Sequence, residues 1–227
     1  MNIALVLAGG TGSRVGGDVP KQYVLAAGKP VISYCMETLT NHEEIDAIQI
    51  VADRRWQEFI LEHVPKDKLR GFSPEGENRQ MSILHGLEDI RKYASDEDWV
   101  LVHDAARPMV RAEQIHDCLV AAFGHDGVIP VLPMKDTVYS SQDGKTISSL
   151  LDRSRIFAGQ APELFQLGVY YKANIRLLPD QIKKINGSTE PAILAGCDMA
   201  MIPGEEENFK ITTGEDLRRF RRLVEGR

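Results

Sequence analysis

NIALVLAGGTGSRVGGDVPKQ, residues Asn2 to Gln22, is the stretch that decides the fold of this chain. Its first six residues, Asn2–Leu7, form an apolar run typical of a buried strand in a parallel sheet. Glycines follow at once, and because glycine has no Cβ, the backbone N–H groups after the strand stay accessible. A concave run of N–H donors binds phosphate oxygens, and Arg14 and Lys21 add positive charge beside it. The stretch therefore predicts a loop that binds a nucleoside triphosphate.

Two other glycine-rich motifs fit this stretch poorly. A Walker A loop needs Lys-Ser or Lys-Thr directly after its glycines, and neither pair occurs here. A dinucleotide-binding fingerprint needs a third small residue, but Val15 stands at that position. A flexible surface turn is the plain alternative, and Arg14 and Lys21 at these spacings favour phosphate binding over it.

The chain continues through Leu7-Ala8-Gly9-Gly10-Thr11-Gly12-Ser13-Arg14 and then Pro20-Lys21-Gln22, which resembles nucleotidyltransferases that activate small phosphates. The Pro-Lys-Gln ending is similar to the cytidylyltransferase branch, which acts on methylerythritol phosphate or ribitol phosphate. The resemblance implies that Arg14 and Lys21 are catalytic cations. It also implies that the nucleotide is bound by Ala8, Gly9, Gly10 and Gly12.

Composition limits the class of protein. The 227 residues suffice for one α/β domain, which we expect to span 1–227. The net charge of −6 argues against a nucleic-acid-binding surface. Three widely spaced cysteines without a C-x-x-C pair indicate neither a zinc site nor disulfides, which fits a reducing cytoplasm. The apolar start is too short to cross a membrane, so we expect a cytoplasmic protein with no membrane partner.

Apolar strands and amphipathic helices alternate along the chain, which indicates parallel pairing. We predict an α/β fold, a three-layer sandwich with a mostly parallel twisted sheet, Rossmann-like and of the nucleotidyltransferase type. The expected strands include Ala47–Val51, Trp99–His103, Gly127–Pro133 and Ala200–Ile202. The expected helices span Pro30 to Asn41, Arg54 to Val64, Asn78 to Tyr93, Arg111 to Gly124, Tyr170 to Leu177 and the segment from Gly214 onward.

A polar segment, Gly71 to Ser82, is expected to be a loop that runs into the third helix. The resembled family contacts cytosine here, and Gly76 and Ser82 take the matching places, with Arg79 three residues before Ser82. Pro74-Glu75 replaces part of the family's glycine pair. In the plain alternative, a residue before the helix caps it and Arg79 is solvated.

The strand Trp99–His103 ends in Asp104-Ala105-Ala106-Arg107-Pro108. An acid at the carboxyl end of a parallel strand faces the crevice where such sheets bind ligands. The motif resembles the methylerythritol-phosphate enzymes, which implies that Asp104 binds nucleotide and Mg²⁺, Ala105 lies at the nucleotide, and Arg107 supports the substrate. The alternatives are an Asp that caps the next helix and a His103 that only bonds the backbone.

The pattern of apolar and polar residues changes near residue 135. Thr137 to Leu151 alternates, with Asp143-Gly144 as a turn, so a β-hairpin arm at about 135–158 is expected to protrude. The resemblance implies a homodimer in which Arg153 of the arm enters the neighbour's site and Thr137 contacts substrate. An exposed hairpin with surface charges is the alternative.

Two later positions complete the resemblance. Thr189 matches a substrate-binding threonine, but Glu190-Pro191 replaces the usual acids and leaves the acceptor open. Lys210, in Asn208–Thr212, matches a catalytic lysine that meets the phosphates opposite Lys21.

The resemblance thus implies transfer of CMP from CTP to 2-C-methyl-D-erythritol 4-phosphate, with Mg²⁺ as cofactor and pyrophosphate as product. Ribitol 5-phosphate or another polyol phosphate is the alternative acceptor. A non-catalytic nucleotide-binding homologue is a second alternative. A dinucleotide-dependent oxidoreductase is disfavoured by the broken fingerprint.

Overall fold

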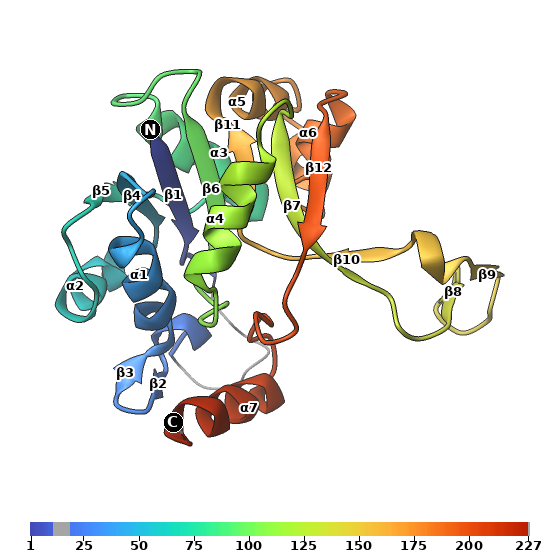
Figure 1. Cartoon of the computed structure of the whole chain (residues 1–227), viewed down its shortest axis with the longest axis horizontal. Helices are drawn as coiled ribbons and strands as arrows, with labels where there is room; N and C mark the ends of the chain where they lie inside the picture. Colours follow the sequence, from blue (N-terminus) through green and yellow to red (C-terminus); the bar gives the residue numbers. More distant parts are fainter. Residues whose placement is uncertain (11–18, 227) are drawn as a thin grey trace.

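A computed structural model describes residues 1–10 and 19–226 of the chain (Figure 1). Among these residues, eight strands form a central sheet in the order β10-β7-β11-β6-β1-β4-β5, with β12 beside β7. The strands are β1 (Asn2–Leu7), β4 (Ala47–Val51), β5 (Leu69–Ser73), β6 (Trp99–Asp104), β7 (Gly127–Pro133), β10 (Phe157–Gly159), β11 (Glu163–Gln166) and β12 (Met199–Pro203).

The sheet is mostly parallel, as predicted. β6, β1, β4 and β5 run in one direction, and β7 and β12 are parallel to each other. Only β10 and β11 break the pattern among the described strands, because each pairs in antiparallel register with its neighbours.

Helices cover both faces of the sheet, which gives the predicted three layers (Figure 1). Along β1, Ala4 and Val6 pack on one face while Ile3 and Leu5 pack on the other, as the two-residue period of a strand requires. One face carries α1 (Val31–Asn41), α2 (Arg54–His63) and α4 (Ala112–Ala121), and the other carries α3 (Arg79–Ile90), α5 (Leu167–Ile175) and α6 (Glu190–Leu194).

The last helix, α7 (Gly214–Glu225), lies near the ends toward which β1 and β6 point (Figure 1). A capping box between Thr213 and Asp216 fixes its first turn. Its Leu217 and Phe220 pack with β2 (Leu25–Ala26) and with the start of α1. The described structure also contains short elements, namely η1 (Lys21–Tyr23), β3 (Lys29–Pro30), η2 (Arg153–Arg155) and η3 (Gln181–Lys184).

The predicted hairpin arm is confirmed. β8 (Val138–Ser140) pairs in antiparallel register with β9 (Ser149–Leu151), and Gly144 in the turn has a φ of +69°, which favours glycine. The arm projects well beyond the three layers in Figure 1. It exposes apolar side chains, among them Ile147 at 68% and Leu150 at 65%.

One prediction about an element was wrong, and one strand was not predicted. Residues 71–73 are not loop but the end of β5, which pairs with β4 through a register shift at Ile48 and Gln49. Arg70 and Gly71 interrupt the apolar pattern, so the short strand gave no periodic signal. The strand β11 (Glu163–Gln166), inserted between β6 and β7, was not among the expected strands. Its pairing depends on distant segments and is not encoded locally.

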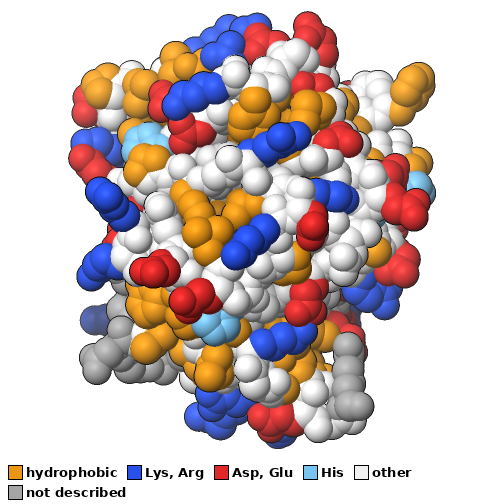
Figure 2. Space-filling model, turned by 90° about the vertical axis from the view of Figure 1, so that its left-hand side faces the viewer, with side chains coloured by type: hydrophobic (Ala, Val, Ile, Leu, Met, Phe, Trp, Pro, Cys, Tyr) orange, Lys and Arg blue, Asp and Glu red, His pale blue; other side chains and the backbone are white. Residues whose placement is uncertain are grey.

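The surface charges and the lengths of the helices can be compared with the expectation that the chain binds neither nucleic acid nor a membrane. In Figure 2, Lys and Arg side chains of the described residues are interspersed with Asp and Glu over the face that is shown. That face therefore carries no continuous basic stripe of the kind that follows a phosphate backbone. None of the helices within residues 1–10 and 19–226 has the length and apolar character needed to cross a bilayer.

Gly127 offers a test of how β7 is held between its neighbours. A Cβ at this position would lie 2.6 Å from the carbonyl oxygen of Leu164 and 2.8 Å from Sδ of Met199. Because a backbone carbonyl cannot move away cheaply, we expect Gly127→Ala to lower the free energy of unfolding by about 1–3 kcal/mol. Urea denaturation measures the change. Gly187→Ala, where nothing lies within 4 Å, is the control. Equal stabilities for the two variants would contradict the packing argument.

Candidate active site

The carboxyl ends of four neighbouring strands meet at one edge of the sheet. Leu7 at the end of β1 pairs with Asp104 at the end of β6 and with Val51 at the end of β4. Val51 in turn pairs with Ser73 at the end of β5. Three features therefore start from adjacent strand ends, where open α/β sheets bind ligands. They are the glycine-rich segment after β1, the loop of residues 74–78 that is expected to contact the base (the base loop), and the acid Asp104.

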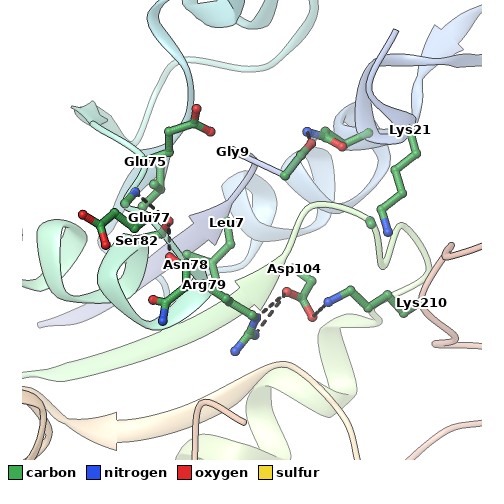
Figure 3. A pocket seen from close by; sticks show the side chains of 15 residues that line it. Leu7, Gly9, Lys21, Glu75, Glu77, Asn78, Arg79, Ser82, Asp104 and Lys210 are labelled. Carbon is green, nitrogen blue, oxygen red and sulfur yellow. Dashed lines mark hydrogen bonds and ion pairs between the residues drawn. The ribbon is translucent and has the colours of Figure 1, made fainter. Parts of the chain in front are cut away.

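A cavity of about 450 Å³ lies at this edge (Figure 3). Its wall combines the end of β1, the loop before α3, the end of β6 and the segment before α7. The lining residues are Leu7, Gly9, Gly10, Lys21, Gln22, Val51, Glu75, Gly76, Glu77, Asn78, Arg79, Ser82, Asp104, Ala106 and Lys210.

Asp104 is the electrostatic centre of the cavity. Its Oδ1 accepts hydrogen bonds from Nε and Nη2 of Arg79 at 3.2 and 3.1 Å, and its Oδ2 accepts one from Nζ of Lys210 at 3.0 Å. Nε of Arg107 lies 3.7 Å from Oδ2. Burial alone would raise the pKa of Asp104, but Arg79, Lys210 and Arg107 outweigh it and hold the pKa well below its usual range.

Arg79 matches the arginine of the resembled motif, but we did not include it among the expected site residues. It is the first residue of α3, and Asn78 caps the helix by accepting a hydrogen bond from the Met81 backbone N–H at 2.8 Å. The cap is as the plain alternative expected, but Arg79 is not solvated, because its guanidinium is paired with Asp104. The match of Arg79 to the family motif was the signal in the sequence that pointed to a role in the site.

The base loop is folded tightly. The Gly76 N–H donates to Oγ of Ser82 at 2.9 Å, and that hydroxyl donates to the Asn78 carbonyl at 3.0 Å. A Cβ on Gly76 would lie 2.4 Å from Cβ of Met81 and 2.7 Å from the Ser82 nitrogen, so only glycine fits. Gly76 and Ser82 thus share one wall of the cavity.

Lys21 reaches the cavity because η1 is anchored to the end of β1. Nε2 of Gln22 donates to the carbonyls of Ala8 at 2.6 Å and Gly10 at 2.8 Å, and the Tyr23 hydroxyl donates to Ala8 O at 2.8 Å. In Figure 3 the Lys21 ammonium points toward Asp104 and Lys210. The predicted residues Gly12 and Arg14 lie outside the described residues.

Lys210 is positioned by the buried Asn208. Nδ2 of Asn208 donates to Oε1 of Gln114 at 2.8 Å and to the Ala161 carbonyl at 2.7 Å. The carbonyl of Asn208 accepts from Nη1 of Arg107 at 2.6 Å. The segment before α7 is therefore fixed against the turn after β6, and Lys210 faces Asp104 across that contact.

His103 bonds only the backbone, as the alternative for this residue expected. It is fully buried, and its Nε2 lies 3.0 Å from the carbonyl oxygen of Arg107. Burial lowers the pKa of His103 to about 4, so the imidazole is neutral near pH 7. It supports the turn that carries Asp104. Asp104 does not cap α4, because Arg111 is the N-cap residue of that helix.

The remaining predicted residues lie behind or outside the described wall. Ala8 and Ala105 are buried beneath it, at 1% and 0% exposure. Thr189 donates to Oε2 of the buried Glu163 at 3.1 Å and does not line the cavity. Thr137 and Arg153 belong to the arm, where Nη1 of Arg153 donates to the Lys135 carbonyl at 2.7 Å. Within one chain, therefore, neither Thr189 nor the arm residues Thr137 and Arg153 line the cavity.

The donor set decides what metal could fit. Across residues 1–10 and 19–226, no group of three or more His, Cys, Asp or Glu side chains is arranged to hold an ion. Asp104 is the buried carboxylate of the cavity, where it pairs with Arg79 and Lys210, and the exposed Glu75 and Glu77 also line the wall. Mg²⁺ takes one or two protein carboxylates and completes its shell with phosphate oxygens and water, so this site fits Mg²⁺ that arrives with a nucleotide.

The 2-C-methyl-D-erythritol 4-phosphate cytidylyltransferase (IspD) family matches residues 2–225. The chain belongs to this family. The predicted resemblance is confirmed, and the chain is a nucleotidyltransferase of the IspD family.

Similar proteins include two named activities. A ribitol-5-phosphate cytidylyltransferase of Streptococcus agalactiae is 32% identical over 100% of this chain and 97% of its own length. A 2-C-methyl-D-erythritol 4-phosphate cytidylyltransferase of Rubrobacter xylanophilus is 33% identical over 95% of this chain and 91% of its own. The crystal structure of 2-C-methyl-D-erythritol 4-phosphate cytidylyltransferase from Francisella tularensis has a TM-score of 0.83 at 25% identity, covering 96% of this chain and 97% of that one. The IspD fold is thus confirmed.

Replacing Asp104 with Asn tests the charge cluster. The change leaves Arg79, Lys210 and Arg107 facing one another without their shared anion. A broken buried ion pair costs about 3–5 kcal/mol, and because Arg79 and Lys210 are about one-third exposed, solvent screening reduces the expected loss at pH 7 to about 2–3 kcal/mol. The measurement is the free energy of unfolding in urea.

The pH dependence of that loss has a definite sign. The pKa of Asp104 is lower in the folded chain than the value of about 3.9 for an unfolded Asp. Its stabilisation is therefore complete well above pH 3.9 and is lost as the pH falls further, so the two proteins should converge in acid. Asp117→Asn, at an exposed position of α4, is the control. A difference that stays constant between pH 7 and pH 3 would contradict this electrostatic account.

Proposed function

We propose that this chain transfers CMP from CTP to 2-C-methyl-D-erythritol 4-phosphate. The observation that carries the proposal is the convergence of Lys21 and Lys210 on one cavity between the base loop and Asp104. Membership of the IspD family supports it, and so does the turn after β6, whose Ala106 lines the cavity without bulk. A phosphate oxygen of the acceptor attacks the α-phosphorus of CTP, and the bond from that phosphorus to the pyrophosphate oxygen breaks.

The chemical problem is one of charge. Two anions must approach to within about 3.5 Å in line, and the site must neutralise both and hold them aligned. Fixed cations stabilise the charge that develops on the phosphates, and we assign this to Lys21, Lys210 and Arg14. Asp104 would hold Mg²⁺, which when bound neutralises phosphate oxygens. Arg79 and Lys210 hold the Asp104 carboxylate oriented toward the cavity.

Ribitol 5-phosphate is the second candidate acceptor. The relatives of that name cover this chain from end to end, and the Gly9-Gly10 pair leans toward them. Glu190, the main departure from the family pattern, does not point into the cavity. Its Oε2 accepts from the Asn186 backbone N–H at 2.8 Å, so the longer acid is used to hold the loop before α6.

The deciding experiment is pyrophosphate release with CTP and a panel of acceptors. We expect the highest kcat/KM with 2-C-methyl-D-erythritol 4-phosphate, compared with ribitol 5-phosphate and glycerol 3-phosphate. A preference for ribitol 5-phosphate would establish the second candidate. CTP binding by calorimetry without turnover on any acceptor would point instead to a non-catalytic homologue.

The two lysines provide the mechanistic test. Each contributes a fixed positive charge to the same cavity, so Lys21→Ala and Lys210→Ala should each lower kcat by on the order of a hundredfold. Lys66→Ala, at an exposed position between α2 and β5, is the matched control and should leave kcat unchanged. Circular dichroism verifies that all three variants fold. Near-normal turnover in both active-site variants would remove the proposed mechanism.

We further propose that the chain acts as a homodimer joined through the arm. The arm exposes Tyr139, Ile147 and Leu150, and a hairpin that leaves the core needs a surface to cover such side chains. In the dimer, Arg153 and Thr137 of one subunit would face the acceptor phosphate bound by its partner. The free thiols of Cys35, Cys118 and Cys197 support a reducing compartment, and we place the reaction in the cytoplasm.

Mixed dimers test the shared site. Arg153→Ala and Lys210→Ala should each be almost inactive alone. When the two are unfolded together and refolded at equal concentration, half of the dimers are mixed, and each mixed dimer has one intact site. Activity should therefore recover to about a quarter of the wild-type value. No recovery, with mixed dimers verified by differential tags, would mean that Arg153 acts within its own chain, and an active Arg153→Ala variant would mean that it has no role.

A further inference from the structure

The Glu75 carboxylate, in the loop before α3, forms no ion pair with any residue within 1–10 and 19–226, although Arg55 is near enough to act on it electrostatically. The loop carries a second acid, Glu77, but Oε2 of Glu77 lies 3.0 Å from Nζ of Lys183 and is paired there. Neither oxygen of Glu75 accepts a hydrogen bond from any of the described residues. Two acceptor atoms are thus available at the wall of the cavity.

The position of Glu75 is fixed by its neighbours on both sides. Ser73, two residues earlier, is buried at the end of β5 and accepts from Nε2 of Gln49 at 2.9 Å. Gly76, the next residue, is held by the Ser82 hydroxyl. The Glu75 backbone is therefore constrained on both sides, although the residue itself is exposed.

The Glu75 side chain lies against the glycine-rich segment. A Cβ added to Gly9 would lie 2.8 Å from Cβ and 2.8 Å from Oε2 of Glu75, so the carboxylate packs directly against the Gly9 backbone. Figure 3 shows Glu75 and Gly9 on the same side of the cavity, above Ser82. The carboxylate thus lies between the loop expected to bind phosphates and the loop expected to bind the base.

The electrostatic surroundings agree with that placement. Partial burial raises the pKa of Glu75, the nearby Asp53 raises it further, and Arg55 opposes the change. A carboxylate that has lost part of its hydration gains from a hydrogen-bond donor that enters the cavity.

We propose that Glu75 is a specificity-determining residue that accepts a hydrogen bond from the exocyclic amino group of the nucleotide base, so that this chain selects CTP over UTP. The inference rests on the proposed function, because it takes the base to lie against Gly76 and Ser82. Cytosine presents an N4 amino donor at the position where uracil presents the O4 acceptor. A carboxylate attracts the first and repels the second, so one side chain supplies both recognition and rejection.

The test compares Glu75→Gln with the wild-type chain. The Gln amide can donate to uracil O4, so the ratio of kcat/KM for CTP to that for UTP should fall at least ~10-fold, as expected for one base-edge contact. Glu75→Gly removes the side chain and should lower CTP use without improving UTP use. Glu88→Gln carries the same chemical change at an exposed position of α3, outside the cavity, and should keep the wild-type ratio.

Calorimetry separates this inference from the proposed function. The dissociation constants of CTP and UTP should shift in the same direction as kcat/KM in Glu75→Gln, whether or not any acceptor is used. If the wild-type chain turns over no acceptor but the affinity ratio changes as expected, the proposed function fails and the role of Glu75 stands. If turnover is normal and both ratios stay within ~2-fold of the wild-type values in a folded Glu75→Gln variant, the role of Glu75 is overturned.

Discussion

The buried carboxylate of Asp104 organises the site, because three cations from different parts of the chain converge on it. Arg79 comes from the start of α3, Arg107 from the turn after β6, and Lys210 from the segment before α7. A buried charge is costly unless it is paired, so Asp104 draws these segments together as the chain folds. The segments meet at the edge of the sheet, and their ion pairs with the Asp104 carboxylate hold them there.

The same convergence prepares the chemistry. Three cations share the one buried carboxylate of Asp104, and Lys21 lies on the wall of the same cavity. Positive charge that is in place before the triphosphate binds does not have to be brought together during the reaction, and this is how preorganised sites lower activation barriers. Stability and function are therefore coupled at this point. Asp104 keeps the cations close to one another by offsetting their mutual repulsion, and the positive charge of these cations attracts a polyanion.

The sequence predicted the parts of the site that are local and failed on the parts that depend on tertiary contacts. Lys21, Asp104 and Lys210 each follow a strand or a motif with a readable pattern, and all three line the cavity. The pairing of Arg79 with Asp104 joins positions 25 residues apart and has no local pattern. For the same reason β11 was missed, since a four-residue strand with both neighbours supplied by other segments has no periodicity of its own. The double anchoring of Ala8 and Gly10 by Gln22 belongs to this group as well.

The arrangement divides the site into two halves with different origins. The nucleotide half is built within one chain from strand ends whose spacing the sheet fixes. The residues assigned above to the acceptor lie apart from that cavity, since Thr189 is buried against Glu163 and the arm residues Thr137 and Arg153 do not line it. In the proposed division, changes in the arm can alter the acceptor while the cations on Asp104 keep their contacts. Such a division explains how proteins that share this fold from end to end can carry the names of two different polyol phosphates. The two halves still interact electrostatically, because the buried Glu163 beside Thr189 acts on Arg79 at the start of α3.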